Sequence, residues 1–452
     1  MSTIDVSSHT AAFVQAWDWK RLSVSVVLVP ALSIAVWWVV SYLASPLRKF
    51  PGPPLAGKTG SYHIKIKELR EKYGPVVRIG PNTLDLDLPG LIKTLYGPDG
   101  KWKTPTTPDR VLPQQQHHNQ WQDHLSPVQH HRPGRACAHE AAHRQVPLAE
   151  QRRGHRALFN SVISEFCEHL ENRFMSGSAP TECDFSEWIG FYSWDANGAA
   201  SFSQRFGYMD KGHGYDGTIA IADKALDYFA AVGQMPSLDF LLDKNPVKRI
   251  GPPNLANITR ISLEHLVARL QGKDPSYNPN ELDFLQHFIE SKETHPELVN
   301  NGVIMGYLLV NLLAGADTTA ITIRAIFWYA LHSPRVYEKL EEEILAVNGR
   351  NKSIWGEDVD TFRPERWLQS AGESDEAYKE RLRLYNASDL TFGGGSRLCI
   401  GRNVALLETY KIVPTLIRKF EIALVDADRK WEVTGSWFPR QKGFNCYLKK
   451  RD

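Results

Sequence analysis

The sequence has little net charge, few cysteines and no internal repeat. Its 452 residues carry 53 basic and 51 acidic side chains, so it lacks the broad positive field that nucleic-acid binding requires. The five cysteines are widely scattered and form no C-x-x-C pair, which excludes a disulfide framework and a structural zinc site of the usual spacing. With 42% apolar and 23% charged residues, the composition is that of a globular protein with a sizeable core.

One apolar run near the N-terminus predicts a membrane anchor. Residues 22–44 are 23 uncharged, mostly apolar residues, enough for a helix to cross roughly 30 Å of hydrocarbon. Arg48, Lys49 and a proline-rich hinge follow instead of a small-residue cleavage site, which favours a retained anchor over a cleaved signal peptide. The predicted organisation is an N-terminal tail at 1–21, the anchor at 22–44, a hinge at 45–57 and one catalytic domain at 58–452.

Residues 105–155 interrupt the globular pattern. This stretch holds eight of the sixteen histidines, eight glutamines and a single aromatic residue, Trp121, so it lacks an apolar face that a helix could bury. We expect it to be disordered. It also contains His139-Glu140-Ala141-Ala142-His143, an H-E-x-x-H pattern that binds zinc when it lies on a helix. A zinc hydrolase is therefore a remote alternative, although chance matches are frequent in His-rich sequence.

Two apolar helices are expected in the second half of the chain. The first begins near Gly302, ends before Ser333 and contains the run AGADTT; its apolar stretch before Asp317 is too short for a second membrane span, so it is predicted to be a buried core helix. The second places its apolar residues every three to four positions. Those residues are Leu406, Tyr410, Val413, Ile417 and Phe420.

The segment Phe392–Asn403, FGGGSRLCIGRN, predicts a cofactor site. It places Cys399 after a glycine-rich loop and just before a helix. Glycines let the backbone approach a flat cofactor closely, and the amides at a helix N-terminus stabilise a thiolate. A thiolate that donates electron density to iron favours cleavage of the O–O bond, and Arg397 could pair with a cofactor carboxylate.

This segment resembles the haem loop of the cytochrome P-450 superfamily. The pattern F-x-x-G-x-R-x-C-x-G matches at Phe392, Gly395, Arg397, Cys399 and Gly401. The resemblance implies a mainly α fold with a small β-sheet, haem b as the cofactor and Cys399 as the axial ligand of its iron.

The run AGADTT resembles the oxygen-activation motif of the same family. Ala314 and Gly315 carry little or no side chain, so a planar cofactor can lie against the helix there. The resemblance implies that Thr318 steers protons to bound dioxygen and that Asp317 supports it, since both side chains can relay protons.

The chain departs from the family pattern in two places. FRPERW, residues 362–367, matches the segment before the haem loop, whose Arg366 pairs in the family with an upstream E-x-x-R helix. Only 14 residues separate Val347 from Phe362, and they contain no E-x-x-R. The E-x-x-R at Glu380–Arg383 lies downstream, in a charged stretch typical of a solvated insertion.

The second departure is at Trp121, which has Leu125 where the family's W-x-x-x-R motif has an arginine that contacts a haem propionate. We hypothesise that residues 105–155 are translated out of frame and that an exon is missing after Val347. The E-x-x-R region would then be absent from this chain.

The resemblance is greatest to membrane-bound fungal enzymes similar to pisatin demethylase. It implies a monooxygenase of secondary or xenobiotic metabolism, with O₂ as co-substrate and electrons from NADPH through NADPH-cytochrome P-450 reductase. The implied location is the endoplasmic reticulum membrane, with a single span and a cytosolic catalytic domain. The implied reaction is hydroxylation or oxidative dealkylation of a lipophilic small molecule. A degenerate relative that binds haem without turnover is the main alternative, and the substrate stays open because it is set by variable loops.

Overall fold

The computed structural model describes residues 62–80, 83–96, 148–177, 181–234, 255–279, 283–333, 363–394 and 398–451, with shorter stretches and single positions between 28 and 51 and between 239 and 251. The chain divides into two compact units, Met1–Pro89 and Gly90–Asp452. Residues 58–89 of the predicted catalytic domain therefore belong to the first unit. The other predicted boundaries stay predictions.

The first unit contains a small α/β element. It comprises the 3-10 helix η1 (Pro46–Lys49), α3 (Tyr62–Tyr73), β1 (Val76–Gly80) and β2 (Thr83–Leu86). β1 and β2 pair antiparallel, and Ile66 and Leu69 of α3 pack with Val77 of β1. The predicted anchor lies largely outside the described residues. Its described apolar side chains are exposed and include Leu28, Leu32, Val36, Val40 and Leu43.

The second unit is mainly helical, as predicted, and contains two small sheets. The 3-10 helix η2 (Pro89–Leu91) lies at the boundary between the units. The helices that follow are α4 (Ile92–Tyr96), α7 (Leu148–Phe174), α8 (Phe185–Phe202), α9 (Tyr208–Lys211), α10 (Thr218–Gln234), α12 (Ala256–Leu270), α13 (Phe284–Thr294), α14 (Asn301–Leu331), the 3-10 helix η3 (Pro364–Trp367), α17 (Asp375–Ser388) and α18 (Arg402–Lys419).

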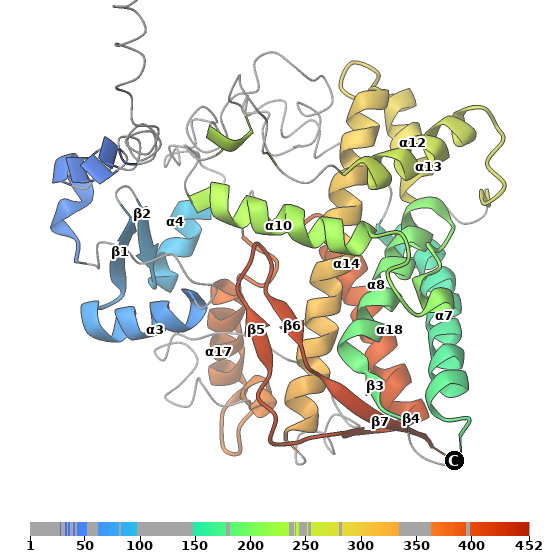
Figure 1. Cartoon of the computed structure of the whole chain (residues 1–452). Coiled ribbons are helices and arrows are strands. Elements are labelled where there is room, and N and C mark those ends of the chain that lie inside the picture. Colours follow the sequence, from blue (N-terminus) through green and yellow to red (C-terminus); the bar gives the residue numbers. More distant parts are fainter. Residues whose placement is uncertain are drawn as a thin grey trace, which may run out of the picture. The chain divides into compact units, whose positions relative to one another are not determined.

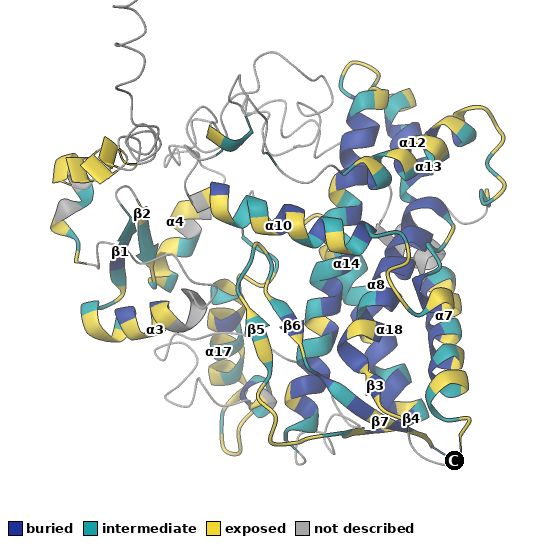
Figure 2. Cartoon of the chain, in the orientation of Figure 1, coloured by how far each residue is buried: buried dark blue, intermediate teal, exposed yellow. Residues whose placement is uncertain are grey.

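A four-helix core of α7, α8, α14 and α18 forms the centre of this unit (Figure 1). The buried residues concentrate on these helices (Figure 2). Sixteen of the eighteen residues of α8 are buried. Phe185 of α8 meets Phe327 of α14 edge to face, with ring centroids 5.2 Å apart, an arrangement that adds to the burial of both rings.

Helix α14 is the long core helix that the sequence predicts. The side chain of Asn300 caps it by accepting a 3.0 Å hydrogen bond from Val303 N, which satisfies one of the free amides of the first turn. By length and composition it is the one described helix that could cross a membrane, but 56% of its most apolar part is buried inside the protein. It contacts α8, α12, α13 and α18, so the prediction of a core helix is confirmed.

The two sheets of the second unit are built from β3 (Cys183–Asp184), β4 (Phe420–Leu424), β5 (Glu432–Thr434), β6 (Arg440–Lys442) and β7 (Asn445–Lys450). The strand order of the larger sheet is β3-β7-β4 and all its pairs are antiparallel. Ile422 lies opposite Leu448, and both are buried. β5 and β6 form a separate hairpin.

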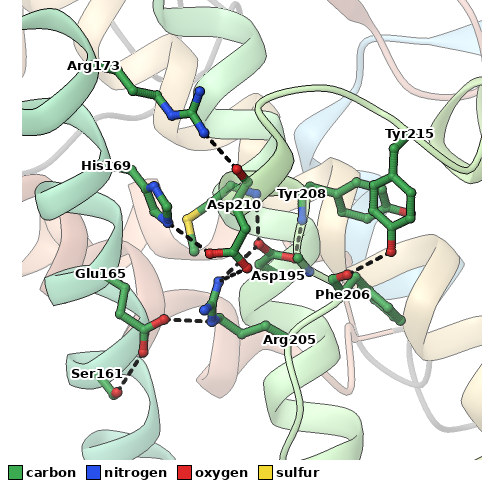
Figure 3. Close-up of polar contacts among 12 residues, drawn as sticks. Ser161, Glu165, His169, Arg173, Asp195, Arg205, Phe206, Tyr208, Asp210 and Tyr215 are labelled. Carbon is green, nitrogen blue, oxygen red and sulfur yellow. Dashed lines mark hydrogen bonds and ion pairs between the residues drawn. The ribbon is translucent and has the colours of Figure 1, made fainter.

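A polar cluster joins α7, α8 and α9 (Figure 3). The carboxylate of Asp195 is fully buried and accepts hydrogen bonds of 2.7–3.1 Å from the backbone N–H groups of three successive residues, Gly207, Tyr208 and Met209. It therefore satisfies amides at the start of α9. Arg205 adds ion pairs to Glu165 of α7 and to Asp210 of α9, at 2.6 and 3.1 Å.

Two sequence expectations need correction. Helix α7 begins at Leu148, so the last eight residues of the segment expected to be disordered are helical; Ala, Glu, Gln and Arg favour a helix without an apolar face. In α18, Tyr410 is exposed and Phe420 begins β4. The buried face of α18 runs instead through Glu408, Thr409, Ile412, Val413, Leu416 and Ile417.

Candidate active site

The cysteine predicted as a metal ligand lies immediately before α18. The backbone N–H of Cys399 donates a 2.7 Å hydrogen bond to Phe392 O. This bond joins the two ends of the loop that contains the glycines of the motif. Gly393 has φ = +74°, a conformation that favours glycine. The Arg402 guanidinium lies 5.7 Å from the centre of the Phe392 ring. The loop therefore holds the Cys399 backbone at the N-terminal end of the helix.

Cys399 differs from the other described cysteines because it is exposed. Cys167, Cys183 and Cys446 are completely buried. Burial raises the pKa of the Cys167 thiol to about 11 and also raises the thiol pKa of Cys183 and Cys446, so these three are expected to stay protonated and inert. Cys399 is thus the accessible thiol among the four cysteines that the structure describes.

The surroundings of Cys399 fit a flat, apolar cofactor. Its two neighbours, Leu398 and Ile400, are 40% and 49% exposed, which is costly for apolar side chains unless something covers them. A Cβ built on Gly401 would meet only the Cys399 sulfur, at 3.9 Å, so the space beside this glycine is open. A haem whose iron is bound by the Cys399 thiolate fits this donor and these surfaces. Gly395 and Arg397 lie outside the described residues.

Helix α14 carries the second part of the candidate site. The hydroxyl of Thr318 donates a 2.6 Å hydrogen bond to Ala314 O, and that of Thr322 donates a 3.0 Å bond to Thr318 O. Val310, Ala314 and Thr322 are exposed, Thr318 is partly exposed, and Tyr329 follows on the same side. This strip of the otherwise buried helix is therefore accessible to a bound molecule.

Asp317 lies in a partly buried, highly charged environment. Burial raises the pKa of its carboxyl group, the guanidinium of Arg324 lowers it, Asp223 of α10 raises it and Arg440 of β6 lowers it. The net shift is upward. An upward shift of the pKa brings a carboxyl group closer to the range in which it can transfer protons, which is the direction that the predicted role requires.

Arg324, Asp223 and Arg440 were not anticipated from the sequence. Arg324 is two helical turns after Asp317, and its Nε donates a 2.8 Å hydrogen bond to Ser186 O of α8. Arg440 pairs with Asp227 of α10 at 2.8 Å. Arg324 could have been noticed in the sequence, because a charged residue inside an apolar helix is unusual. That Asp223 of α10 and Arg440 of β6 lie near Asp317 is seen only in the fold.

Gly315 has a packing role that the sequence did not suggest. A Cβ at this position would lie 3.0 Å from Nδ2 of Asn197 in α8. The same Nδ2 donates hydrogen bonds of 3.1 and 3.2 Å to the backbone carbonyls of Asn311 and Leu312. Glycine therefore allows α8 and α14 to approach closely. The predicted contact of Gly315 with a cofactor stays a prediction.

The structure brings α14 and α18 into contact but makes no direct bond between the two motifs. Among the described residues, no hydrogen bond or ion pair joins Cys399 to Thr318 or Asp317. The thiol and the hydroxyl are therefore separate elements that a bound cofactor and substrate would bring into one reaction.

The charged insertion behaves as expected. Glu380 and Arg383 of α17 pair with each other, and their side chains are 64% and 65% exposed, so this E-x-x-R is a solvated surface pair. Arg366 in η3 is buried, and its Nε donates a 3.1 Å hydrogen bond to Arg363 O.

The rival zinc motif at His139–His143 lies outside the described residues, as do Trp121 and Phe362. In the part of the chain that the structure describes, there is no group of three or more His, Cys, Asp or Glu side chains that could hold a metal ion.

Comparison with known proteins identifies the family. The cytochrome P450 family model matches residues 53–360 and 345–438. The chain belongs to the cytochrome P450 family. It is 34% identical to cytochrome P450 monooxygenase cfoH of Aspergillus candidus, over 93% of this chain and 91% of the relative. It is 27% identical to cytochrome P450 monooxygenase cicH of Emericella nidulans, over 90% of this chain and 94% of the relative. By family it is therefore a P450 monooxygenase, and the expected mainly helical P450 fold is confirmed.

Both comparisons also bear on the hypothesis of a missing internal segment. The family model matches this P450 in two ranges that overlap at 345–360, within the stretch where the sequence lacks an E-x-x-R. The alignment with cfoH spans 505 positions, more than the 452 residues of this chain. The relative therefore has residues for which this P450 has no counterpart.

Proposed function

We propose that this P450 inserts one oxygen atom of O₂ into a lipophilic small molecule of fungal secondary or xenobiotic metabolism, by hydroxylation or oxidative dealkylation. The observation that carries the proposal is the exposed Cys399 thiol at the start of α18, a helix in contact with the α14 helix that exposes Thr318. Family membership supports haem-thiolate iron, O₂ and electrons from a reductase. We further propose haem b as the cofactor and NADPH as the electron source, through NADPH-cytochrome P450 reductase.

In this proposal each residue has one task. Cys399 binds the iron, and the haem when bound supplies the metal at which O₂ is activated. Phe392, Gly395, Gly401 and Ala314 form the surfaces against which the flat cofactor lies. Arg397 pairs with a haem propionate.

The protons come from α14. Thr318 holds a proton on its Oγ1, which the bond to Ala314 O orients. Asp317 replaces that proton, because burial raises the pKa of its carboxyl group and Arg324 keeps the deprotonated form accessible.

The proposed location is the endoplasmic reticulum membrane, with residues 22–44 as a single span and the catalytic domain in the cytosol. The length and apolar character of this segment support an anchor. The lipophilic substrate class agrees with such a location.

The test is a reduced, carbon-monoxide difference spectrum of the expressed chain. The Soret band of thiolate-ligated haem should be present in the parent protein and absent in Cys399→Ala. Cys167→Ala, which changes a buried cysteine, should keep the band. A band that survives Cys399→Ala would refute the proposed ligand.

A degenerate, catalytically inactive haem-binding relative is the second candidate. The division of the family match into two ranges and the longer alignment with cfoH favour it. A version with the segment of a relative restored between Val347 and Phe362 separates the two. If only the restored version shows the band and oxidises substrate, this chain is a defective product of a monooxygenase gene.

A further inference from the structure

Arg381 of helix α17 makes hydrogen bonds to the backbone of η3. Arg381 donates through Nη1 to Arg366 O, and through Nη2 to Leu368 O at 2.9 Å. Both carbonyls belong to the 3-10 helix or to the residue that ends it. A guanidinium presents several donors in a rigid plane, so the Arg381 side chain can bind both carbonyls at once and hold α17 against η3.

Glu373 and two tyrosines hold Arg381 in place. The carboxylate of Glu373 accepts bonds from Arg381 Nε and Nη2 at 2.7 and 2.6 Å, the bidentate arrangement that is strong and specific. The guanidinium lies 5.4 and 5.5 Å from the ring centres of Tyr378 and Tyr385. The Arg381 hydrogen bond lowers the pKa of Glu373 to about 2, so the pair is charged in neutral solution.

Aromatic contacts complete the attachment. Tyr378 donates a 2.9 Å hydrogen bond to Trp367 O. The rings of Trp367 and Tyr385 meet edge to face at 5.3 Å, and Tyr385 is buried. All of these residues lie between 366 and 385, so the attachment is local in sequence.

The loop that carries Cys399 follows directly from α17. Ser388 ends the helix eleven residues before Cys399. The described residues of this loop make local hydrogen bonds: Thr391 N donates to Asp389 Oδ1, Gly393 N to Leu390 O and Cys399 N to Phe392 O. The direction in which the chain enters the loop is therefore set by where α17 rests on η3.

We propose that Arg381, clamped by Glu373, is a positioning residue for the haem-ligand loop, and that the insertion helix α17 supports this loop. The positioning of a haem ligand rests on the proposed function; the support of the loop by α17 does not. Arg381 acts through the backbone of η3 and α17 and has no contact with the reacting atoms.

The experiment compares Arg381→Gln with Arg383→Gln in the full chain. Arg383 is the matched control because it is on the same helix, two residues away, and pairs only with Glu380 at the exposed surface. Amide hydrogen exchange is followed in peptides covering 364–368 and 389–399. We expect exchange in both peptides to become about tenfold faster in Arg381→Gln and to stay unchanged in Arg383→Gln, because charge-assisted bonds are lost in the first variant alone.

A second variant guards against misfolding of the first. Glu373→Gln keeps the Arg381 bonds to the two carbonyls and removes only the charge partner, so its exchange should rise by less than that of Arg381→Gln. If exchange changes at 364–368 but not at 389–399, α17 is clamped but does not position the loop, and the inference is overturned. Unchanged exchange in both peptides overturns it completely.

The carbon-monoxide difference spectrum gives the second measurement. Arg381→Gln should convert at least half of the thiolate-type Soret band into the band of haem without thiolate ligation, and Arg383→Gln should not. A parent chain without any thiolate-type band refutes the proposed function, while hydrogen exchange still decides whether Arg381 positions the loop. A band that is identical in Arg381→Gln and the parent contradicts the positioning role.

Discussion

The four-helix core and the stretch that carries the cysteine, residues 363–401, are built in different ways. The core joins helices that are far apart in sequence and buries whole rings, such as Phe185 and Phe327, between them. The cysteine stretch is held by local contacts around Arg381, and its thiol and the flanking Leu398 and Ile400 are exposed.

The four-helix core and the cysteine stretch therefore obtain their stability from different sources. Burial of apolar area in the core stabilises the fold without a cofactor. A cofactor that buried Leu398 and Ile400 would stabilise the cysteine stretch more than the core. The following predictions test that comparison.

The largest effect is expected on the rate of turnover, from a substitution on the accessible side of α14. Thr318→Ala should slow product formation by about 10²–10⁴-fold, the range for loss of a group that transfers protons, with little change in stability. Thr322→Ala, one turn later and with the same type of backbone bond, should turn over normally. Equal rates for the two variants would contradict the role of Thr318. The measurement is product formed per haem in single-turnover assays with the best substrate found by screening.

A core variant should lower stability without changing the cysteine loop. Phe327→Ala removes a fully buried ring and should lower the free energy of unfolding by about 3–5 kcal/mol. Leu263→Ala on α12, which is 41% exposed, should change it by less than about 0.5 kcal/mol. Denaturant titration followed by circular dichroism measures both. Similar losses in the two variants would mean that the core is not packed as described.

The core should also make stability depend on pH through Glu408. Burial raises the pKa of this carboxyl group in α18 to about 8, and Oε1 has no hydrogen-bond partner among the described residues. Because its pKa is higher in the folded state, its contribution is full below about pH 4.5 and is lost as the pH rises towards 8. The loss is at most about 1.4 kcal/mol per pH unit.

Glu408→Gln should remove this part of the pH dependence between pH 5.5 and 7.5. Glu421→Gln in β4, whose partner Lys449 is exposed, is the control and should keep it. Free energies of unfolding at the two pH values decide. A slope that is the same in Glu408→Gln and the parent protein would show that Glu408 is ionised in the fold.

The smallest effect is expected on the surface of α17. Glu380→Gln removes an exposed pair and should change the free energy of unfolding by less than about 0.5 kcal/mol. It should leave the carbon-monoxide difference spectrum intact. A loss of the thiolate-type band in this variant would mean that this E-x-x-R is functional after all.

Part of the fold could be predicted from the sequence, because apolar residues recur at regular spacing in the elements that are most buried. The core helix beginning at Asn301 and the exposed E-x-x-R followed from apolar spacing and charge. The prediction for Tyr410 was wrong: its spacing fits the buried face of α18, yet its side chain is 49% exposed. The helix at 148–155 was missed because it forms from residues of high helix propensity without an apolar face.

The sequence by itself determined the family and predicted Cys399, Asp317 and Thr318 as site residues, since motifs depend on fixed residues at fixed spacing. Only the tertiary structure decided that Gly315 packs against Asn197, that Asp223 and Arg440 act on Asp317 and that Arg381 holds η3. The physical reason is that each of these contacts joins residues whose distance is set by how the helices and strands pack, and spacing along a chain carries no record of that packing.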